Sequence, residues 1–472
     1  MLAGTGVVVV LAAFAVLRWG GALPWGSDND EYLLVAERLR SLESPLVAGV
    51  EGTKYPLGYP VLLALIGWVR LPVVEAALVA NGLAIAGTAL LVALTARRLG
   101  LGDVAAFGAA GYAAANAALW GSAYWVMPDT LLTLAAAAFL YVMARDGPFG
   151  WLVVVVVIAA ALKTVGVVFG VAATVGLVLR GRRTVPQALV VAGGALVVTG
   201  AMWLAVAGLP EHTTGYGRTF WLEDVYDASD GEVGVREVVA RLWENAGDTF
   251  RDLGWAVASP EVPVGLAQVL GLLLVGLGVL AFRRRWPTVV PFVVMYLAVV
   301  LVWPFESARF GLPLVPLTAA GVGSLVAAVT RVTPAAVGAV VTAAAVVAFA
   351  LWTGPEVRTR ADLEGAELAA IHQSMDDFEE WASGNLPADD EIASLDYREI
   401  SRALDRDVQP VGYTADTGEL LEQIGDADWF VVVEAGFHSR RLALARLLLF
   451  ERPEHFEPVY AQGRVEVYST RP

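Results

Sequence analysis

The stretch VEAALVANGLAIAGTALLVALTARR at 74–98 decides the fold class of this chain. Its apolar part is long enough to cross a bilayer core, which needs roughly 20 residues of α-helix, and Arg97 and Arg98 follow it directly. Similar apolar runs recur along the chain, and the candidate spans are 4–23, 74–95, 104–120, 128–144, 151–162, 165–179, 186–207, 263–282, 289–303, 312–330 and 334–352. The sequence therefore predicts an α-helical polytopic membrane protein with about 11 transmembrane helices.

The composition supports this class. Of 472 residues, 57% are hydrophobic and 17% are charged, and the mean hydropathy is +0.62. The chain has no cysteine, which excludes disulfides, thiolate metal sites and cysteine nucleophiles. Residues 354–472 hold 25 acidic and 11 basic side chains, so they carry −14 of the net charge of −15. Since no basic surface stands out, nucleic acid is not an expected partner.

Arginine clusters beside the apolar runs predict the orientation of the chain. Basic residues favour the cytoplasmic side of a membrane, and with a cytoplasmic N-terminus every cluster falls in a short inner turn. The clusters are Arg97–Arg98, Arg145, Arg180 with Arg182 and Arg183, Arg283–Arg285 and Arg331. An odd number of spans then places the C-terminal residues outside the cell membrane. No small-residue cleavage signature follows the run at 4–23, so this run is interpreted as a retained anchor.

Two parts of the chain are expected from these patterns. Residues 1–353 form the transmembrane part, with outer loops at 24–73 and 208–262, and residues 354–472 form a small extracytoplasmic α/β domain. Helical spacing predicts a helix at 31–42 in the first outer loop, and the short run 59–69 is expected to lie along the membrane interface. In the C-terminal part, the patterns predict strands at 391–395, 429–433 and 465–468, alternating with helices at 417–424 and 438–450.

Lys54 and Lys163 are the only lysines, and both fall on the predicted outer side. Lys163 separates two apolar runs that are each short for a crossing. These runs are interpreted as a hairpin of short helices with Lys163 at its outer tip, and the alternative is one long kinked helix with a snorkelling lysine. Lys54 precedes a rigid aromatic stretch that begins at Tyr55, and it either snorkels to headgroups or supplies a compact ammonium group.

Three carboxylates, Asp28, Asp30 and Glu31, follow the first span directly. Asp30 and Glu31 either serve a functional site or form a hydrated, acidic first helical turn that interacts with the helix dipole. Asp28 is expected to precede the helix and to face the bilayer surface. Farther along, Asp129 follows Pro128 at the entry to the run 128–144, and Arg309 is an isolated outer arginine whose simplest alternative role is contact with anionic headgroups.

Five short motifs in a fixed order carry a resemblance to a known superfamily. They are Asp28 with Tyr32 and Ala36, Lys54 with Pro56, Pro128 with Asp129, Lys163 with Gly166, and Arg309-Phe310-Gly311-Leu312-Pro313. In this order the chain resembles the GT-C superfamily of membrane glycosyltransferases, in the branch of the protein-O-mannosyltransferases and aminoarabinose transferases. Many relatives carry Asp-Glu where this chain has Asp28-Asn29, and aligning Tyr32 and Ala36 selects Asp28 as the corresponding carboxylate.

The resemblance implies an inverting glycosyltransferase that moves a sugar from a polyprenyl-phosphate donor to an acceptor at the outer face. Lys54, Lys163 and Arg309 are then expected to bind the donor phosphate, and Asp28 to act as general base. Asp129 is the second catalytic carboxylate and orients the site or the acceptor. The supporting residues are Asp30, Glu31, Tyr32 and Tyr55. No metal ligands are assigned, a divalent metal stays open as a cofactor, and membrane lipids surround the protein.

Two other functions remain as alternatives. A transporter or flippase also has many spans and clustered charges, but such proteins place ionisable residues near the bilayer midplane, often at repeat interfaces. A sensor or scaffold with a ligand-binding outer domain is the other possibility. The sequence leaves the sugar, the lipid length and the acceptor open, and acceptors in the superfamily include proteins, lipids and envelope glycans.

Overall fold

The structure is a computed structural model that describes residues 28–42, 55–69, 71–145, 148–206, 222–224, 227–257, 261–303, 308–411, 416–434 and 439–470. The predicted first span at 4–23 and Lys54 lie outside these residues. The helices before the C-terminal unit are α2 (Asp28–Arg40), α3 (Gly58–Gly67), α4 (Val73–Arg98), α5 (Asp103–Ala114), α6 (Ala117–Ala123), α7 (Asp129–Arg145), α8 (Phe149–Leu162), α9 (Val167–Leu179), α10 (Val185–Val206), α13 (Val235–Trp255), α14 (Val264–Ala281), α15 (Trp286–Val302) and α16 (Val315–Val332). Short 3-10 turns lie between them at η1 (Thr164–Gly166), η2 (Arg182–Thr184), η3 (Arg283–Arg285) and η4 (Ala308–Leu314).

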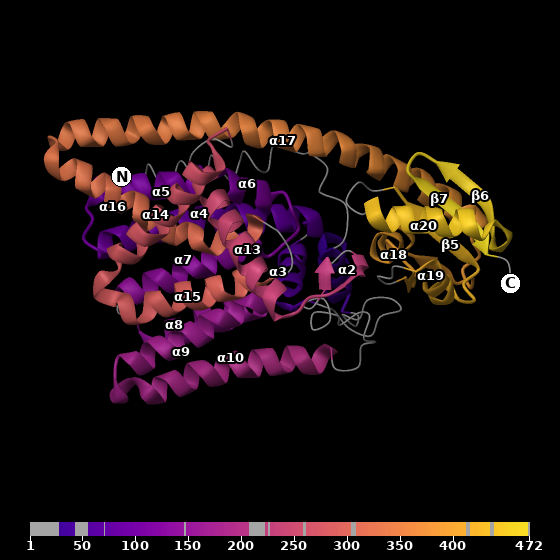
Figure 1. Ribbon diagram of the computed structural model, residues 1–472, viewed down its shortest axis with the longest axis horizontal. Coiled ribbons are helices and arrows are strands. Elements are labelled where there is room, and N and C mark those ends of the chain that lie inside the picture. Colours follow the sequence, from indigo (N-terminus) through magenta and orange to yellow (C-terminus); the bar gives the residue numbers. More distant parts are fainter. Residues whose placement is uncertain are drawn as a thin grey trace.

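Apolar helices packed side by side form the larger part of the molecule (Figure 1). Within the described residues, five helical stretches are long and apolar enough to cross a membrane: Val73–Arg98, Val264–Ala281, Arg283–Val302, Arg309–Val332 and Ala335–Gly354. Shorter apolar helices accompany them. The predicted helical membrane fold is therefore confirmed.

Three phenylalanines join α7, α9 and α15 in the core of this part. The ring centroid of Phe292 lies 5.3 Å from that of Phe139 and 5.1 Å from that of Phe169. All three side chains are fully buried. Aromatic rings at these separations attract one another in addition to burying apolar area, so this cluster fixes three helices that lie far apart in the sequence.

The two short runs around Lys163 form a hairpin. Helix α8 ends at Leu162, Lys163 is extended (φ −155°, ψ 143°), and α9 returns along α8. A Cβ added at Gly166 would lie 1.9 Å from the carbonyl oxygen of Ala159, and one at Gly170 would lie 3.1 Å from Val156 Cγ1. Contacts between residues on either side of the turn are incompatible with one continuous helix, so the hairpin prediction is confirmed.

The predicted span at 104–120 is not one continuous helix. The structure has two helices here, α5 and α6, separated at Ala115 and Asn116. The Asn116 side chain accepts a hydrogen bond from Leu119 N at 3.1 Å and thereby caps α6. An asparagine in this position starts a new helix because its side chain replaces a missing backbone partner.

Helix α17 (Ala335–Asn385) connects the membrane part to the C-terminal unit. It extends well past the predicted end of the last span at residue 352, and in Figure 1 it runs along the membrane part as far as the C-terminal unit. The elements after it are β3 (Ile392–Ser394), α18 (Tyr397–Leu404), β4 (Gln409–Pro410), α19 (Thr417–Ile424), β5 (Trp429–Val433), α20 (Ser439–Glu451), η6 (Pro453–His455), β6 (Phe456–Gln462) and β7 (Val465–Thr470). The predicted strands and helices of this unit are confirmed, while α18, β4 and β6 had not been predicted.

The C-terminal unit contains a mixed five-stranded sheet in the order β4-β3-β5-β7-β6. Strand β3 pairs in parallel with both β4 and β5, whereas β7 pairs antiparallel with both β5 and β6. Along β5, Val431 packs with the apolar side chains of α17 and α18, whereas Phe430 packs with those of α19 and α20. Alternation along one strand therefore buries both faces of the sheet.

Candidate active site

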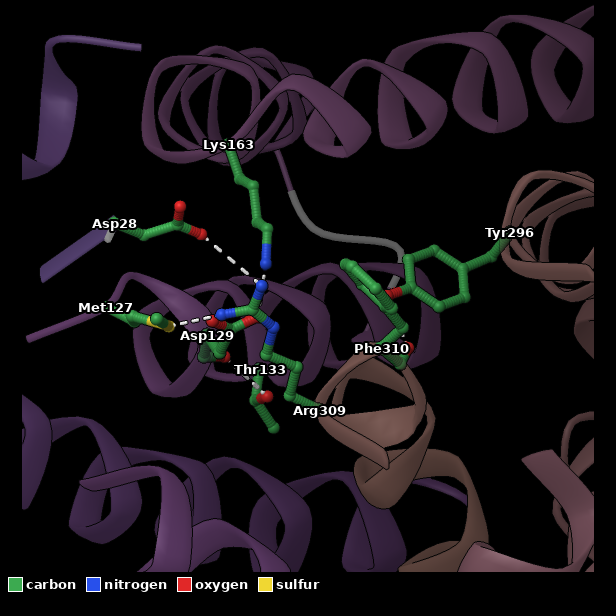
Figure 2. Close-up of polar contacts among 8 residues, drawn as sticks. All are labelled: Asp28, Met127, Asp129, Thr133, Lys163, Tyr296, Arg309 and Phe310. Carbon is green, nitrogen blue, oxygen red and sulfur yellow. Dashed lines mark hydrogen bonds and ion pairs between the residues drawn. The ribbon is translucent and has the colours of Figure 1, made fainter. Parts of the chain in front are cut away.

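Four charged side chains from distant parts of the sequence meet where several helices begin or end. Asp28 is the first residue of α2, Asp129 is the first residue of α7, Lys163 lies in the α8–α9 turn, and Arg309 lies in η4. Figure 2 shows the two cations and the two carboxylates facing one another. The sequence predicts all four as residues of one site, and the structure brings them together.

The Asp129–Lys163 pair is the tighter and more deeply buried of the two ion pairs. Lys163 Nζ lies 2.5 Å from Asp129 Oδ1, and the exposed fractions of the two side chains are 17% and 3%. Lys163 Nζ also lies 4.9 Å from the centroid of the Phe310 ring, a distance typical of a cation–π contact. Asp129 Oδ2 is buried without a hydrogen-bond partner among the described residues.

A buried asparagine holds the turn that precedes Asp129. Asn81 Nδ2 donates to the carbonyl oxygens of Ala123 and Trp125 at 3.1 and 2.9 Å, and Thr130 Oγ1 donates to Asn81 Oδ1 at 2.6 Å. These bonds link α4 to the end of α6 and to the first turn of α7. Asn81 and Thr130 therefore fix the position of Asp129, and the sequence did not mark either of them as a site residue.

The Asp28–Arg309 pair is looser and more accessible. Arg309 Nη2 lies 3.4 Å from Asp28 Oδ2, and the exposed fractions are 30% and 18%. Charge-assisted hydrogen bonds of good geometry are about 2.7–2.9 Å long, so this contact is weaker than the Asp129–Lys163 pair. Asp28 was expected to precede the helix, and that expectation is wrong, because the carboxylate belongs to the acidic first turn of α2.

Three tyrosine rings pack together next to Asp28, and one of them contacts its carboxylate. The Tyr55 hydroxyl donates a hydrogen bond to Asp28 Oδ1. The ring of Tyr32 packs between those of Tyr55 and Tyr59, with centroid distances of 5.0 and 5.3 Å. Tyr32 is 2% exposed and Tyr59 is fully buried. Tyr55 therefore touches the site directly, whereas Tyr32 supports Tyr55.

The turn that carries Arg309 contacts two residues that the sequence did not mark as site residues. Arg309 Nη1 contacts Met127 Sδ, and the hydroxyl of Tyr296 on α15 donates to the carbonyl oxygen of Phe310 at 2.8 Å. Figure 2 shows Met127 and Tyr296 on either side of the arginine turn. Met127 lies two residues before Asp129, so the Met-Pro-Asp stretch contributes a second contact to the same site.

Asp30 and Glu31 lie in the same turn as Asp28 but bind elsewhere. Asp30 Oδ1 lies 3.0 Å from Arg402 Nη1, and Glu31 Oε2 lies 2.9 Å from Arg398 Nη2, both on α18 of the C-terminal unit. Burial disfavours the charge of Arg398, but the Glu31 carboxylate and Tyr397 outweigh it and hold the pKa of Arg398 above its ordinary value. These two carboxylates therefore join the two parts of the molecule.

The arrangement is suited to an anionic ligand next to an accessible base. Lys163 and Arg309 present two positive charges side by side, and such pairs stabilise phosphate oxygens. The two carboxylates differ in solvent exposure, because Asp28 reaches solvent whereas Asp129 is enclosed. Within the part of the chain that the structure describes, no three histidine or carboxylate side chains are grouped as metal ligands.

The fold matches that of solved membrane glycosyltransferases. The structure is similar to ArnT from Cupriavidus metallidurans in the apo state, with a TM-score of 0.59 and 16% identity over 99% of this chain and 98% of that chain. Its similarity to the same protein bound to undecaprenyl phosphate has a TM-score of 0.55 and 14% identity over 99% and 97% of the two chains. The oligosaccharyltransferase of Archaeoglobus fulgidus, tethered with an acceptor peptide, matches with a TM-score of 0.55 and 12% identity over 99% and 74%.

These similarities establish the class of fold. The chain has the GT-C fold implied by its motifs, and it is a multi-pass membrane protein. No protein-family model matches the chain, and no curated protein matches it in sequence.

Proposed function

We propose that the protein is an integral-membrane glycosyltransferase that transfers a sugar from a polyprenyl-phosphate donor to an acceptor at the extracytoplasmic face. The observation that supports this most strongly is the cluster of Asp28, Asp129, Lys163 and Arg309. It occurs in the fold shared with ArnT, which has been solved bound to undecaprenyl phosphate. Two cations beside an accessible carboxylate meet the requirements of a reaction that releases a lipid phosphate.

The leaving group is the first part of the proposed mechanism. When the bond between the anomeric carbon and the phosphate oxygen breaks, negative charge develops on the phosphate. Arg309 and Lys163 stabilise that charge, and Lys54 is proposed to contribute to the same phosphate. Asp129 holds Lys163 in place through the 2.5 Å ion pair.

The acceptor hydroxyl is the second part. A hydroxyl group of ordinary acidity needs a base within hydrogen-bond reach, and Asp28 is the carboxylate that is both near the cations and accessible. Donor phosphate competes for Arg309, which releases Asp28 to accept the proton of the acceptor. A single displacement with one base inverts the configuration at the anomeric carbon, whereas retention requires a carboxylate nucleophile.

A transporter or flippase fits the site less well. Asp28 and Asp129 each open a helix, Lys163 lies between two helices, and Arg309 lies in a 3-10 turn. Charged residues of transporters usually lie near the middle of the bilayer. The charges of this chain gather instead where helices start and stop, next to the C-terminal unit.

The proposed orientation places the site and residues 354–472 outside the plasma membrane, with the N-terminus in the cytoplasm and residues 1–353 as the transmembrane catalytic part. Thr164 tests this orientation because it is exposed and follows Lys163 directly. The chain has no native cysteine to interfere with labelling. A membrane-impermeant thiol reagent is expected to label Thr164→Cys from the outside of intact cells, and labelling from the cytoplasmic side alone would contradict the orientation.

The function is tested with the purified full-length protein and a radiolabelled polyprenyl-phosphate sugar. Transfer of label to a membrane or cell-envelope extract is expected for the natural protein and not for Asp28→Asn. The matched control is Asp103→Asn, which removes a carboxylate that pairs with Arg97 at 2.8 Å and is 65% exposed. Movement of the intact donor across vesicles without bond cleavage would support the transporter instead.

A further inference from the structure

Two buried ion pairs attach the helix of Asp28 to the C-terminal unit. Asp30 pairs with Arg402 and Glu31 pairs with Arg398, at 3.0 and 2.9 Å, and the carboxylate side chains are 3% and 4% exposed. The partners lie far apart in the chain, and Asp30 and Arg402 are separated by 372 positions in the sequence. Figure 1 shows α2 on the side of the membrane part that faces α18.

More distant charges continue the same contact along α2. Arg402 Nε lies 3.8 Å from Glu37 Oε2, and Arg38 Nη2 lies 3.8 Å from Asp407 Oδ1. Glu37 is about two helical turns beyond Asp30, so these residues occupy one face of α2. The charged face of α2 is therefore directed at α18 and at the residues that follow it.

The three neighbouring carboxylates of α2 have different partners, and this difference links the α2–α18 contact to the site. Asp28, Asp30 and Glu31 lie in one helical turn, where three negative charges repel one another and compete for nearby cations. Arginines from α18 neutralise Asp30 and Glu31, while Arg309 and Tyr55 bind Asp28. This division leaves one carboxylate of the turn for the site.

We propose that Arg398 and Arg402 are positioning residues through which the C-terminal unit fixes the first turn of α2, and with it Asp28. This role rests on the proposed function, because it concerns the placement of the general base. Removal of the arginines leaves two carboxylates buried without these countercharges. Such groups regain water when the surrounding structure moves, and the first turn of α2 then shifts away from α18.

The kinetic test uses the double variant Arg398→Gln/Arg402→Gln in the full-length protein. Its kcat is expected to fall by roughly tenfold or more with donor KM changed by less than about twofold, because a small displacement of a catalytic group slows the chemical step more than ground-state binding. Adding Asp30→Asn and Glu31→Gln removes the uncompensated charge and is expected to recover most of the rate. Arg446→Gln breaks the pair with Glu466 elsewhere in the same unit and is expected to leave kcat unchanged.

A second measurement does not depend on sugar transfer. Asn29 lies between Asp28 and Asp30 and is 1% exposed. Asn29→Cys is expected to react slowly with a thiol reagent in the otherwise natural chain and at least about tenfold faster beside Arg398→Gln/Arg402→Gln, as expected for local opening of a helical turn. The compensated variant is expected to restore slow labelling.

The two measurements separate the possible failures. Unchanged labelling and unchanged kcat in the arginine double variant would overturn the positioning role. A rise in donor KM alone would assign the arginines to donor binding and would also overturn it. If labelling accelerates but no form of the protein transfers sugar, the contact between α18 and α2 stands and the proposed function fails.

Discussion

Two carboxylate–cation pairs, one beside the membrane helices and one in the C-terminal unit, differ mainly in burial. In the Asp129–Lys163 pair the exposed fractions are 3% and 17%, whereas in the Glu466–Arg446 pair they are 26% and 41%. An exposed pair contributes about 0–1 kcal/mol to stability. Removing one partner of a buried pair costs about 3–5 kcal/mol, because the remaining charge is left without compensation.

The Asp28–Arg309 pair lies between these extremes, at 18% and 30% exposure and 3.4 Å. It is buried enough for its charges to interact strongly and open enough for a ligand to separate them. Burial thus predicts three different behaviours: Asp129–Lys163 holds the structure, Asp28–Arg309 reacts, and Glu466–Arg446 contributes little.

Asp28→Asn is expected to reduce sugar transfer by roughly 10²–10⁴-fold, the usual contribution of a general base. The amide keeps the shape of the side chain and can still accept a hydrogen bond from Tyr55. Thermal unfolding in detergent should therefore change little, and donor affinity should change far less than kcat. If Asp28→Asn keeps near-normal turnover while Asp30→Asn loses it, Asp30 is the base and the motif alignment is off by two residues.

Lys163→Met is expected to damage both function and stability. Loss of a charge-assisted contact to the donor phosphate weakens binding by about 1.5–3 kcal/mol, which is measurable as a rise in the donor dissociation constant. Asp129 is also left buried without its cation, so the free energy of unfolding should fall by about 3–5 kcal/mol.

A double variant separates these two effects. Lys163→Met/Asp129→Asn removes the uncompensated carboxylate and is expected to recover most of the thermal stability but not the donor affinity. Recovery of both would show that Lys163 acts through the fold alone.

Tyr55→Phe is expected to slow transfer modestly. It deletes the hydrogen bond to Asp28 Oδ1 without changing the ring that packs on Tyr32. A hydrogen bond to a charged group contributes about 1.5–3 kcal/mol, so kcat/KM should fall by one to two orders of magnitude at most. Tyr468→Phe is the matched control, because it deletes a tyrosine–carboxylate hydrogen bond, to Glu466, in the C-terminal unit.

The sequence could predict the fold because each membrane helix is a continuous apolar segment of the chain. Apolar length and flanking arginines indicate membrane helices locally, and the sidedness of the arginines favoured a hairpin at Lys163 over one long kinked helix. The break between α5 and α6 was also visible in principle, because Asn116 is a capping residue within an apolar run. Apolar length alone does not reveal this break, because both helices are apolar.

The candidate site could be predicted only in part, because its remaining contacts depend on tertiary packing. The order of the motifs suggested that Asp28, Asp129, Lys163 and Arg309 act together. The arginines that bind Asp30 and Glu31 could not be inferred, because Arg398 and Arg402 lie in α18, a helix with no apolar run to mark it as a neighbour of α2. Asn81 was equally hidden, since its role depends on carbonyl groups from a turn more than forty residues away.

Glu466→Gln is expected to have the smallest effect. Burial acts to raise the pKa of Glu466, but hydrogen bonds from Arg446 and Tyr468 outweigh it and hold that pKa below its ordinary value of 4.5. A carboxylate with a lowered folded pKa stabilises the protein above its unfolded pKa, and this contribution disappears as the pH falls through the folded pKa. The variant should therefore lose less than about 1 kcal/mol at neutral pH, in keeping with a partly exposed pair, and nothing below the folded pKa. Thermal unfolding of the natural protein and of the variant, at neutral pH and at a pH below the folded pKa, measures the stability that Glu466 contributes. A loss of stability at neutral pH as large as that of Lys163→Met would contradict the ranking of the pairs by burial.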